Sequence, residues 1–133
     1  MRSNATIDAL RRALHGRTDV RVAVLFGSRA RGTARPDSDV DVAVLGSTVD
    51  SFELARELAL AVGAEVDVVN LFDPGVPLLE SIIRDGIVVH EGERGAGALW
   101  RSRALATLET DRPGFARMRD AWLRRVAEGR MGW

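Results

Sequence analysis

The sequence predicts an α/β protein of the two-layer α+β type, in which helices cover a small mixed β-sheet. Short runs rich in Val and Leu alternate with longer segments of helical periodicity along the chain. The connection between the first two apolar runs, residues 27–38, is too long for a tight hairpin. The chain has 133 residues, a length typical of one domain.

We therefore expect a single domain over residues 1–133, with a core over about 18–92 and a C-terminal helical segment over about 96–129. Glycines that follow apolar helical periodicity, such as Gly16, Gly63 and Gly86, predict helix ends. Runs of β-branched residues predict strands. The expected helices cover residues 6–14, 52–62, 77–84, 98–108 and 115–127, and the expected strands cover 20–26, 39–45, 65–71 and 87–90.

Composition narrows the possible functions. The formal net charge is zero, so the overall charge does not favour nucleic-acid binding. No apolar run approaches the roughly 20 residues of a membrane span, and the first ten residues lack the apolar stretch of a signal peptide. The chain has no cysteine and therefore no disulfide. We expect a cytoplasmic protein that binds neither membrane nor nucleic acid directly.

The C-terminal part of the chain differs from the rest in charge. Residues 1–93 contain 10 Arg and 15 acidic residues, whereas residues 94–133 contain 9 Arg and 4 acidic residues. Trp100, Trp122 and Trp133 also lie there, and Trp and Arg often anchor interfaces. One hypothesis is that this region docks a partner protein. The alternative is that Trp100 and Trp122 pack on the sheet while the arginines are solvated.

Three carboxylates are candidates for a metal site. Asp39 and Asp41 alternate along a predicted strand, so both side chains point to one face with Cα atoms about 7 Å apart. Carboxylates suit Mg²⁺, and two metal ions can clamp a phosphoryl or nucleotidyl transfer. Asp67 lies between Val66 and Val68 in another predicted strand. It can join the pair if the two strands are neighbours.

A candidate phosphate-binding turn precedes the carboxylates. Gly27 lets a phosphate approach the backbone, and Ser28 adds a hydroxyl at the start of a short helical turn. Arg29, Arg31 and Arg35 could supply positive charge to a triphosphate. The turn is not a Walker A loop, because that loop requires a lysine and the chain contains none.

Each feature alone has an ordinary explanation. A D-x-D pair can be a solvated strand end, and Asp67 can be an exposed edge position. The aspartates at 37, 39 and 41 also match the first three ligands of an EF-hand. That loop requires Gly and Glu where this chain has Val42 and Thr48, which excludes it. The order of the features along the chain favours the nucleotide-transfer interpretation.

The stretch GSRARGTARPDSDVDVAVL, from Gly27 to Leu45, resembles the signature of the DNA polymerase β-like nucleotidyltransferase superfamily. With VRVAVLFGSRARG and the short chain, it is similar to the minimal nucleotidyltransferases (MNT type). The resemblance covers about residues 20–90 and implies the polymerase β-like fold. The C-terminal PGFARMRDAWLRR resembles the closing helix of that family more loosely.

The resemblance implies a site with two Mg²⁺ ions. Asp39, Asp41 and Asp67 would bind the metal, and Asp67 would also take the acceptor proton. Gly27 and Ser28 would bind the triphosphate of the substrate ATP, with Arg31 the best-placed arginine and Arg29 the second. Glu65 is the competing acid, because it shares a strand face with Asp67.

Three functions follow from the resemblance. Many MNT proteins are antitoxins of HEPN-domain toxin RNases, and some transfer AMP from ATP onto a toxin tyrosine. The chain would then modify a hydroxyl of a protein partner, in a homo- or hetero-oligomer of unspecified size. It could instead act as an antitoxin by binding alone. Transfer to a small molecule such as an aminoglycoside is the third possibility, although relatives with that activity carry a further helical domain.

Overall fold

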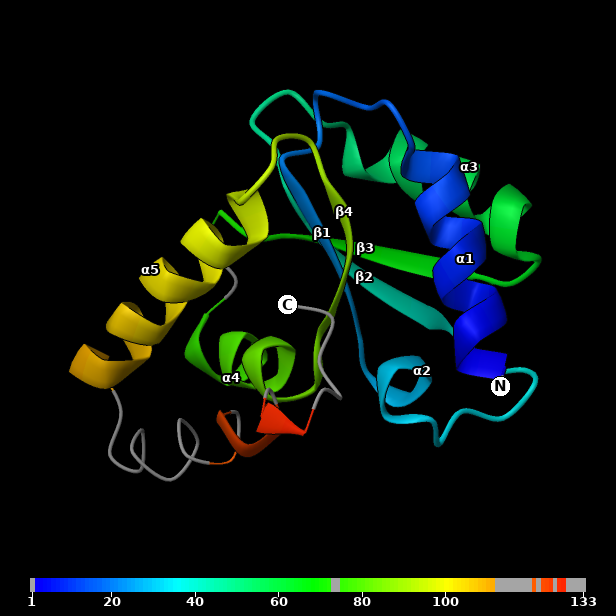
Figure 1. Cartoon of the computed structure of the whole chain (residues 1–133). Coiled ribbons are helices and arrows are strands. Elements are labelled where there is room, and N and C mark those ends of the chain that lie inside the picture. The colour runs from blue at the N-terminus through cyan, green and yellow to red at the C-terminus, as the bar shows by residue number, and fades with distance from the viewer. Residues whose placement is uncertain (1, 73–74, 112–120, 122, 126, 129–133) are drawn as a thin grey trace.

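A four-stranded mixed sheet forms the centre of the molecule (Figure 1). The computed structural model describes residues 2–72, 75–111, 121, 123–125 and 127–128. Among these residues the strands lie in the order β3-β2-β1-β4. Their bounds are β1 Val22–Phe26, β2 Val40–Leu45, β3 Val66–Asn70 and β4 Ile87–Glu91. All four expected strands are thus present, some shorter than expected by one or two residues at an end.

Helices lie on both faces of this sheet (Figure 1). Their bounds are α1 Arg2–Leu14, α2 Ser28–Arg31, α3 Ser51–Val62, α4 Val76–Asp85 and α5 Ala96–Asp111. The prediction of a mixed sheet covered by helices is confirmed, and the second helical face adds a layer to the expected two. The expected helix at 115–127 lies largely outside the described residues. No described helix combines the length and apolar character needed to cross a bilayer.

Two hydrophobic cores explain why the sheet carries helices on both faces. Leu10 of α1 and Leu54 of α3 are buried against one face. Ile82 of α4 and Trp100 of α5 are buried against the other. Strand β1 is buried along its whole length because its side chains alternate between these two cores. Trp100 is only 7% exposed, which confirms packing on the sheet rather than an anchor for a partner.

Strand pairing determines where the candidate site lies. Strands β1 and β2 are antiparallel, and residues 27–39 with the short helix α2 connect them. Strands β2 and β3 are parallel, and α3 forms the crossover between them. The Asp50 side chain caps α3 by accepting hydrogen bonds from the amides of Phe52 and Glu53. This crossover brings the strand that carries Asp67 beside the strand that carries Asp41.

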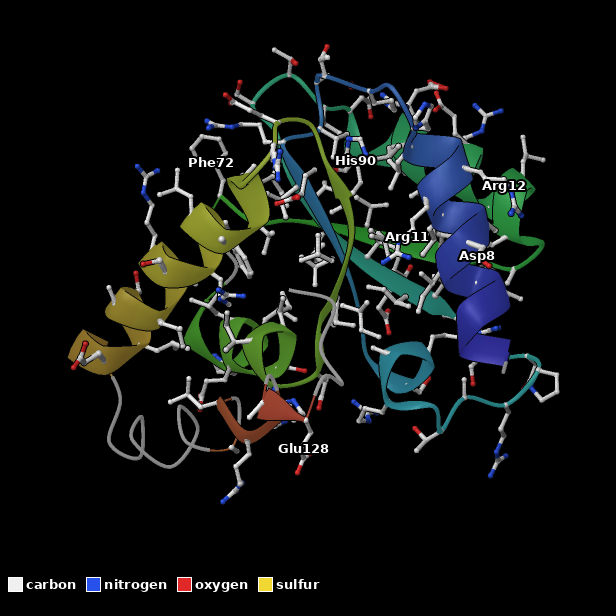
Figure 2. All side chains as sticks on the ribbon, in the orientation of Figure 1. Asp8, Arg11, Arg12, Phe72, His90 and Glu128 are labelled. Atoms are coloured by element: carbon white, nitrogen blue, oxygen red, sulfur yellow. The ribbon has the colours of Figure 1, made fainter. Side chains whose placement is uncertain are left out.

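Strand β4 forms one edge of the described sheet, and two side-chain contacts connect it to the N-terminal part of the chain (Figure 2). The Arg11 guanidinium of α1 donates to the carbonyl of Val88 at 3.4 Å. The His90 Nε2 atom lies 2.9 Å from the carbonyl oxygen of Arg17, in the turn after α1. These contacts join the N-terminal helix and its following turn to β4.

Candidate active site

Two of the three predicted carboxylates lie opposite each other on adjacent strands. Asp41 of β2 is the register partner of Asp67 in β3, and Phe26 of β1 pairs with Asp41 on the other side. Adjacent strands lie about 4.8 Å apart, so the Asp41 and Asp67 side chains emerge side by side on one face. Asp39 directly precedes β2 and is exposed. The structure therefore meets the condition under which Asp67 joins the D-x-D pair.

The half-buried position of Asp41 makes its negative charge costly. Burial raises the pKa of the Asp41 carboxyl, and the charges of Asp67 and Asp39 raise it further. The positive charge of Arg31 lowers the pKa of Asp41. Mutual repulsion among three carboxylates is the electrostatic feature that a bound divalent cation would relieve.

The donor set suits Mg²⁺ in its chemistry, because carboxylate oxygens are the ligands this ion prefers. Within the residues that the structure describes, however, no three acidic, His or Cys side chains converge closely enough to form a complete metal site. Mg²⁺ commonly completes its coordination with waters and substrate phosphates. The carboxylates thus fit the role of partial ligands, which a nucleotide would complement.

Gly27 is required by the position of Asp41. Its φ of +77° and ψ of −157° lie in a region that is essentially restricted to glycine. A Cβ atom at this position would also collide with the Asp41 carboxylate. Its carbonyl accepts hydrogen bonds from the amides of Ala30 and Arg31, which begins α2. The Gly-Ser turn therefore accommodates the carboxylate, a constraint beyond the phosphate approach that the sequence indicated.

Arg29 stabilises the loop that leads into β2. One of its terminal nitrogens donates to the carbonyl of Ser38 at 2.6 Å and lies 3.4 Å from the carbonyl of Pro36. Its Nε atom is buried without a hydrogen-bond partner among the described residues. These bonds hold the loop immediately before Asp39. Arg29 therefore has a structural role, whether or not it also contacts a nucleotide.

Arg31 is the more accessible arginine of α2. Its side chain is 44% exposed, and its Nη1 atom lies 3.4 Å from a carboxylate oxygen of Asp85 at the end of α4. Asp85 also accepts from Arg84 Nε at 3.4 Å. The sequence contained no sign of the Arg31–Asp85 pair, because the two residues are far apart along the chain and neither belongs to a motif.

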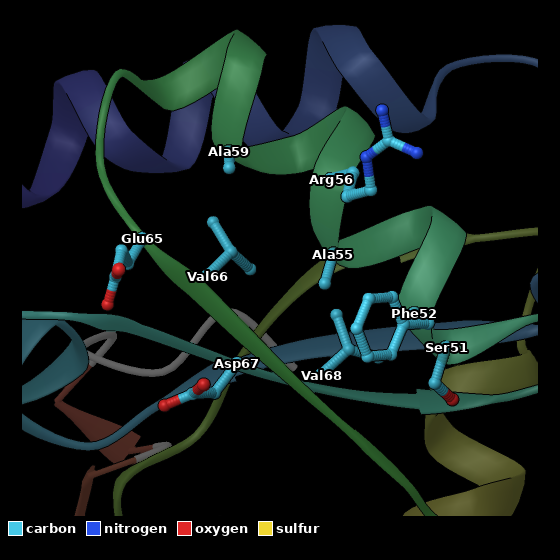
Figure 3. A pocket seen from close by; sticks show the side chains of 9 residues that line it. All are labelled: Ser51, Phe52, Ala55, Arg56, Ala59, Glu65, Val66, Asp67 and Val68. Carbon is cyan, nitrogen blue, oxygen red and sulfur yellow. The ribbon is translucent and has the colours of Figure 1, made fainter.

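A hollow lies between α3 and β3, next to the carboxylates (Figure 3). Both Glu65 and Asp67 line it, and both are exposed. Figure 3 shows their carboxylates pointing away from α3, whereas Val66 and Val68 point toward it. Because Asp67, not Glu65, is the register partner of Asp41, the pairing favours Asp67 as the third acid. No sequence pattern reveals the hollow, because its two walls come from separate elements that meet only in the fold.

Comparison with known proteins identifies the family of the chain. The family model described as polymerase beta, nucleotidyltransferase, matches residues 8–94. The chain therefore belongs to the polymerase β-like nucleotidyltransferase family, as its motif indicated. The matched region contains all seven residues proposed for the site: Gly27, Ser28, Arg29, Arg31, Asp39, Asp41 and Asp67.

Individual relatives point to one branch of this family. The chain is similar to protein adenylyltransferase MntA of Shewanella oneidensis, with 39% identity over 66 residues. That match spans 47% of this chain and 48% of the relative, about half the length of each.

Solved structures extend the similarity over nearly the whole chain. One is described as a toxin-antitoxin with AMP-PNP, at 26% identity and a TM-score of 0.63, covering 96% of this chain and 99% of that one. Another is a MntA-HpeT toxin-antitoxin mutant in which two aspartates are replaced by glutamate. It has 25% identity and a TM-score of 0.62, and the alignment covers 94% and 98% of the two chains.

Proposed function

We propose that this protein transfers AMP from ATP to a hydroxyl of a partner protein, a HEPN-domain toxin RNase, and thereby acts as an antitoxin. The observation that carries the proposal is the placement of Asp67 directly opposite Asp41, beside the Gly27 turn. The similarity to a protein adenylyltransferase and to a toxin-antitoxin with an ATP analogue supports the choice of nucleotide and acceptor. This function places the protein in the cytoplasm.

In the proposed reaction the acceptor hydroxyl oxygen attacks the α-phosphorus of ATP. A bond forms between that oxygen and the phosphorus, the bond from the phosphorus to the bridging oxygen breaks, and pyrophosphate leaves. Asp67 takes the hydroxyl proton, as general bases do in such steps. Gly27, Ser28 and Arg31 bind the triphosphate and orient it against the carboxylates. Arg29 holds the loop before Asp39.

Asp39, Asp41 and Asp67 would hold two Mg²⁺ ions. When bound, the ions would supply electrostatic stabilisation of the charge that develops on the phosphate oxygens. Burial raises the pKa of Asp41, and repulsion from Asp67 and Asp39 raises it further; a cation held by these residues would offset that repulsion, which supports the assignment.

The decisive experiment is to incubate the protein with ATP, Mg²⁺ and the product of the neighbouring gene, and to read mass shifts afterwards. Each transfer adds one AMP unit to the acceptor and releases one pyrophosphate. Labelled ATP distinguishes the α-phosphate, which is retained, from the γ-phosphate, which is lost. A tight complex without any mass shift would favour an antitoxin that acts by binding alone. Modification of a free aminoglycoside without any protein acceptor would favour small-molecule transfer.

A further inference from the structure

The hollow between α3 and β3 has the composition of a docking groove. Its volume is about 450 Å³. Phe52, Ala55 and Ala59 of α3 form one wall, and Val66 and Val68 of β3 form the other; we call this hollow the α3–β3 groove. Phe52 is 81% exposed at its rim. An exposed aromatic ring beside an apolar hollow is typical of a surface that a partner covers.

Strand β3 is an edge strand among the described residues, and its outer side can accept another strand. The Val40 amide donates to the carbonyl of Glu65 at 2.9 Å, and the Leu71 amide donates to the carbonyl of Val44 at 2.8 Å. In a parallel pair, alternate residues bond to the same neighbour. The intervening residues, Val66 and Val68, therefore direct their amide and carbonyl groups outward, away from β2.

The same alternation separates the two faces of β3 (Figure 3). Val66 and Val68 point toward α3, while Asp67 points to the carboxylate face. A strand added beside β3 would follow this period of two. The residue opposite Asp67 would then point to the carboxylate face, and its two sequence neighbours would point into the α3–β3 groove.

We propose that the α3–β3 groove and the outer edge of β3 bind an extended segment of the acceptor protein, with the modified hydroxyl residue opposite Asp67 and apolar residues immediately before and after it. The inference rests on the proposed function, since Asp67 must meet the acceptor hydroxyl. The groove is continuous with that carboxylate, because Asp67 itself lines it. The 133 residues contain no tyrosine, so a tyrosine acceptor lies outside them.

The first test compares two substitutions on one helix. Phe52→Asp places a charge at the groove, whereas Leu60→Asp makes the same chemical change outside it; the two side chains are 81% and 87% exposed. Binding of the neighbouring toxin is measured by calorimetry with α,β-methylene-ATP present, because its carbon bridge replaces the oxygen that AMP transfer would cleave from the α-phosphorus. We expect Phe52→Asp to weaken toxin binding and to raise the KM for the toxin by about tenfold or more. Leu60→Asp should leave both within about twofold, as neutral surface changes do.

Both variants should keep the wild-type melting temperature and the KM for ATP, because neither side chain is buried. Equal effects of the two substitutions, or no effect of either, would overturn the docking proposal. If the wild-type protein binds the toxin but transfers no AMP, the proposed function fails while the calorimetry still decides where the toxin docks. If the wild-type protein does not bind the toxin at all, both proposals are wrong.

The second test is on the acceptor. After mass spectrometry identifies the modified residue, its neighbours are changed one at a time to asparagine, which is polar but adds no charge that the carboxylates would repel. Changes one residue before or after should raise the KM for the toxin about tenfold, because those side chains enter the groove. Changes two residues away should have smaller effects, because those side chains lie on the carboxylate face. The reverse pattern would overturn the strand register proposed here.

Discussion

The two edges of the sheet differ in their surroundings. At the β4 edge, the strand forms hydrogen bonds with α1 and the turn after it, whereas at the β3 edge an apolar groove lies beside the candidate catalytic residue Asp67. Arg11 reaches the carbonyl of Val88, and His90 contacts the carbonyl of Arg17. On the opposite edge, Asp67 is exposed and the groove beside it is open. Proteins normally protect sheet edges from unwanted pairing. From this difference we propose that the β4 edge serves stability and the β3 edge serves recognition.

The largest effect on activity that we expect is at the β3 edge. Asp67→Asn should lower kcat for AMP transfer roughly 10²–10⁴-fold, the range typical of a lost general base. The melting temperature should be unchanged, because the exposed side chain contributes no packing, or higher, because the substitution removes a charge that repels Asp41. Steady-state assays with circular dichroism melting measure both. Glu65→Gln is the matched control on the same strand face, and loss of activity there with retention in Asp67→Asn would show that Glu65 is the third acid.

A smaller loss of activity, combined with a loss of stability, is expected at the Gly-Ser turn. Gly27→Ala should lower kcat about 100-fold, since the new Cβ displaces the Asp41 carboxylate and misplaced groups cost about this much. Backbone strain should lower the free energy of unfolding by roughly 1–3 kcal/mol. Chemical denaturation and transfer assays test the two effects.

Gly63→Ala at the end of α3 separates strain from geometry. Gly63 also has a positive φ, +71°, but no described atom lies within 4 Å of a Cβ added there. This variant should lose about 1 kcal/mol of stability for the left-handed conformation and keep its activity. If it loses as much activity as Gly27→Ala, the collision with Asp41 is not the cause.

At the β4 edge we expect a loss of stability without a loss of activity. His90→Ala removes the contact to the Arg17 carbonyl and should lower the free energy of unfolding by about 1 kcal/mol. The KM for ATP and the transfer rate should stay the same, because β4 lies at the far edge of the sheet from β3. His15→Ala, at an exposed position, is the control and should change stability by less than about 0.5 kcal/mol. A drop in activity without a drop in stability would contradict the division between the edges.

The smallest effect concerns the charge of Asp41. Because burial and neighbouring acids raise its folded-state pKa, the folded state binds the proton more tightly than the unfolded state. Asp41 therefore destabilises the metal-free protein as pH rises through that pKa. At neutral pH without metal, Asp41→Asn should raise the melting temperature by about 2 °C, a small change because solvent screens the half-exposed group.

The same comparison repeated at a pH below the ordinary pKa of aspartate provides the control. There the wild-type carboxyl is protonated in both states, so the difference in melting temperature should shrink toward zero. A difference that does not depend on pH would indicate a packing effect instead of a charge effect.

Local features of the sequence predicted the elements of the fold well. Gly16, Gly63 and Gly86 predicted the ends of α1, α3 and α4 to within one residue, because a helix end depends on neighbours in the chain. The first helix begins at Arg2, four residues before its expected start. The period of two predicted that Asp39 and Asp41 share a strand face; in the structure Asp39 directly precedes β2, and its charge still acts on Asp41. The family motif predicted the candidate site, and the family match covers its residues; their roles stay a prediction.

Trp100 shows why the interface hypothesis could not be settled from composition. A tryptophan contributes a large apolar surface either to a core or to a partner, and the sequence does not distinguish them. Packing of α5 against the sheet buries Trp100. Trp122 and Trp133 lie outside the described residues, so the docking role of the C-terminal region stays a prediction.

The sequence by itself determined the order of strands and helices along the chain, the Gly-Ser turn and the alternation of carboxylates. Each of these depends on backbone preferences over a few residues. Only the tertiary structure decided that Asp67 lies opposite Asp41 and that a groove opens beside β3. It also decided the roles of the two arginines of α2: Arg29 bonds to the loop before β2, and Arg31 pairs with Asp85. Those relations join segments far apart in the chain. They depend on strand register and helix packing, which the whole set of buried contacts selects together.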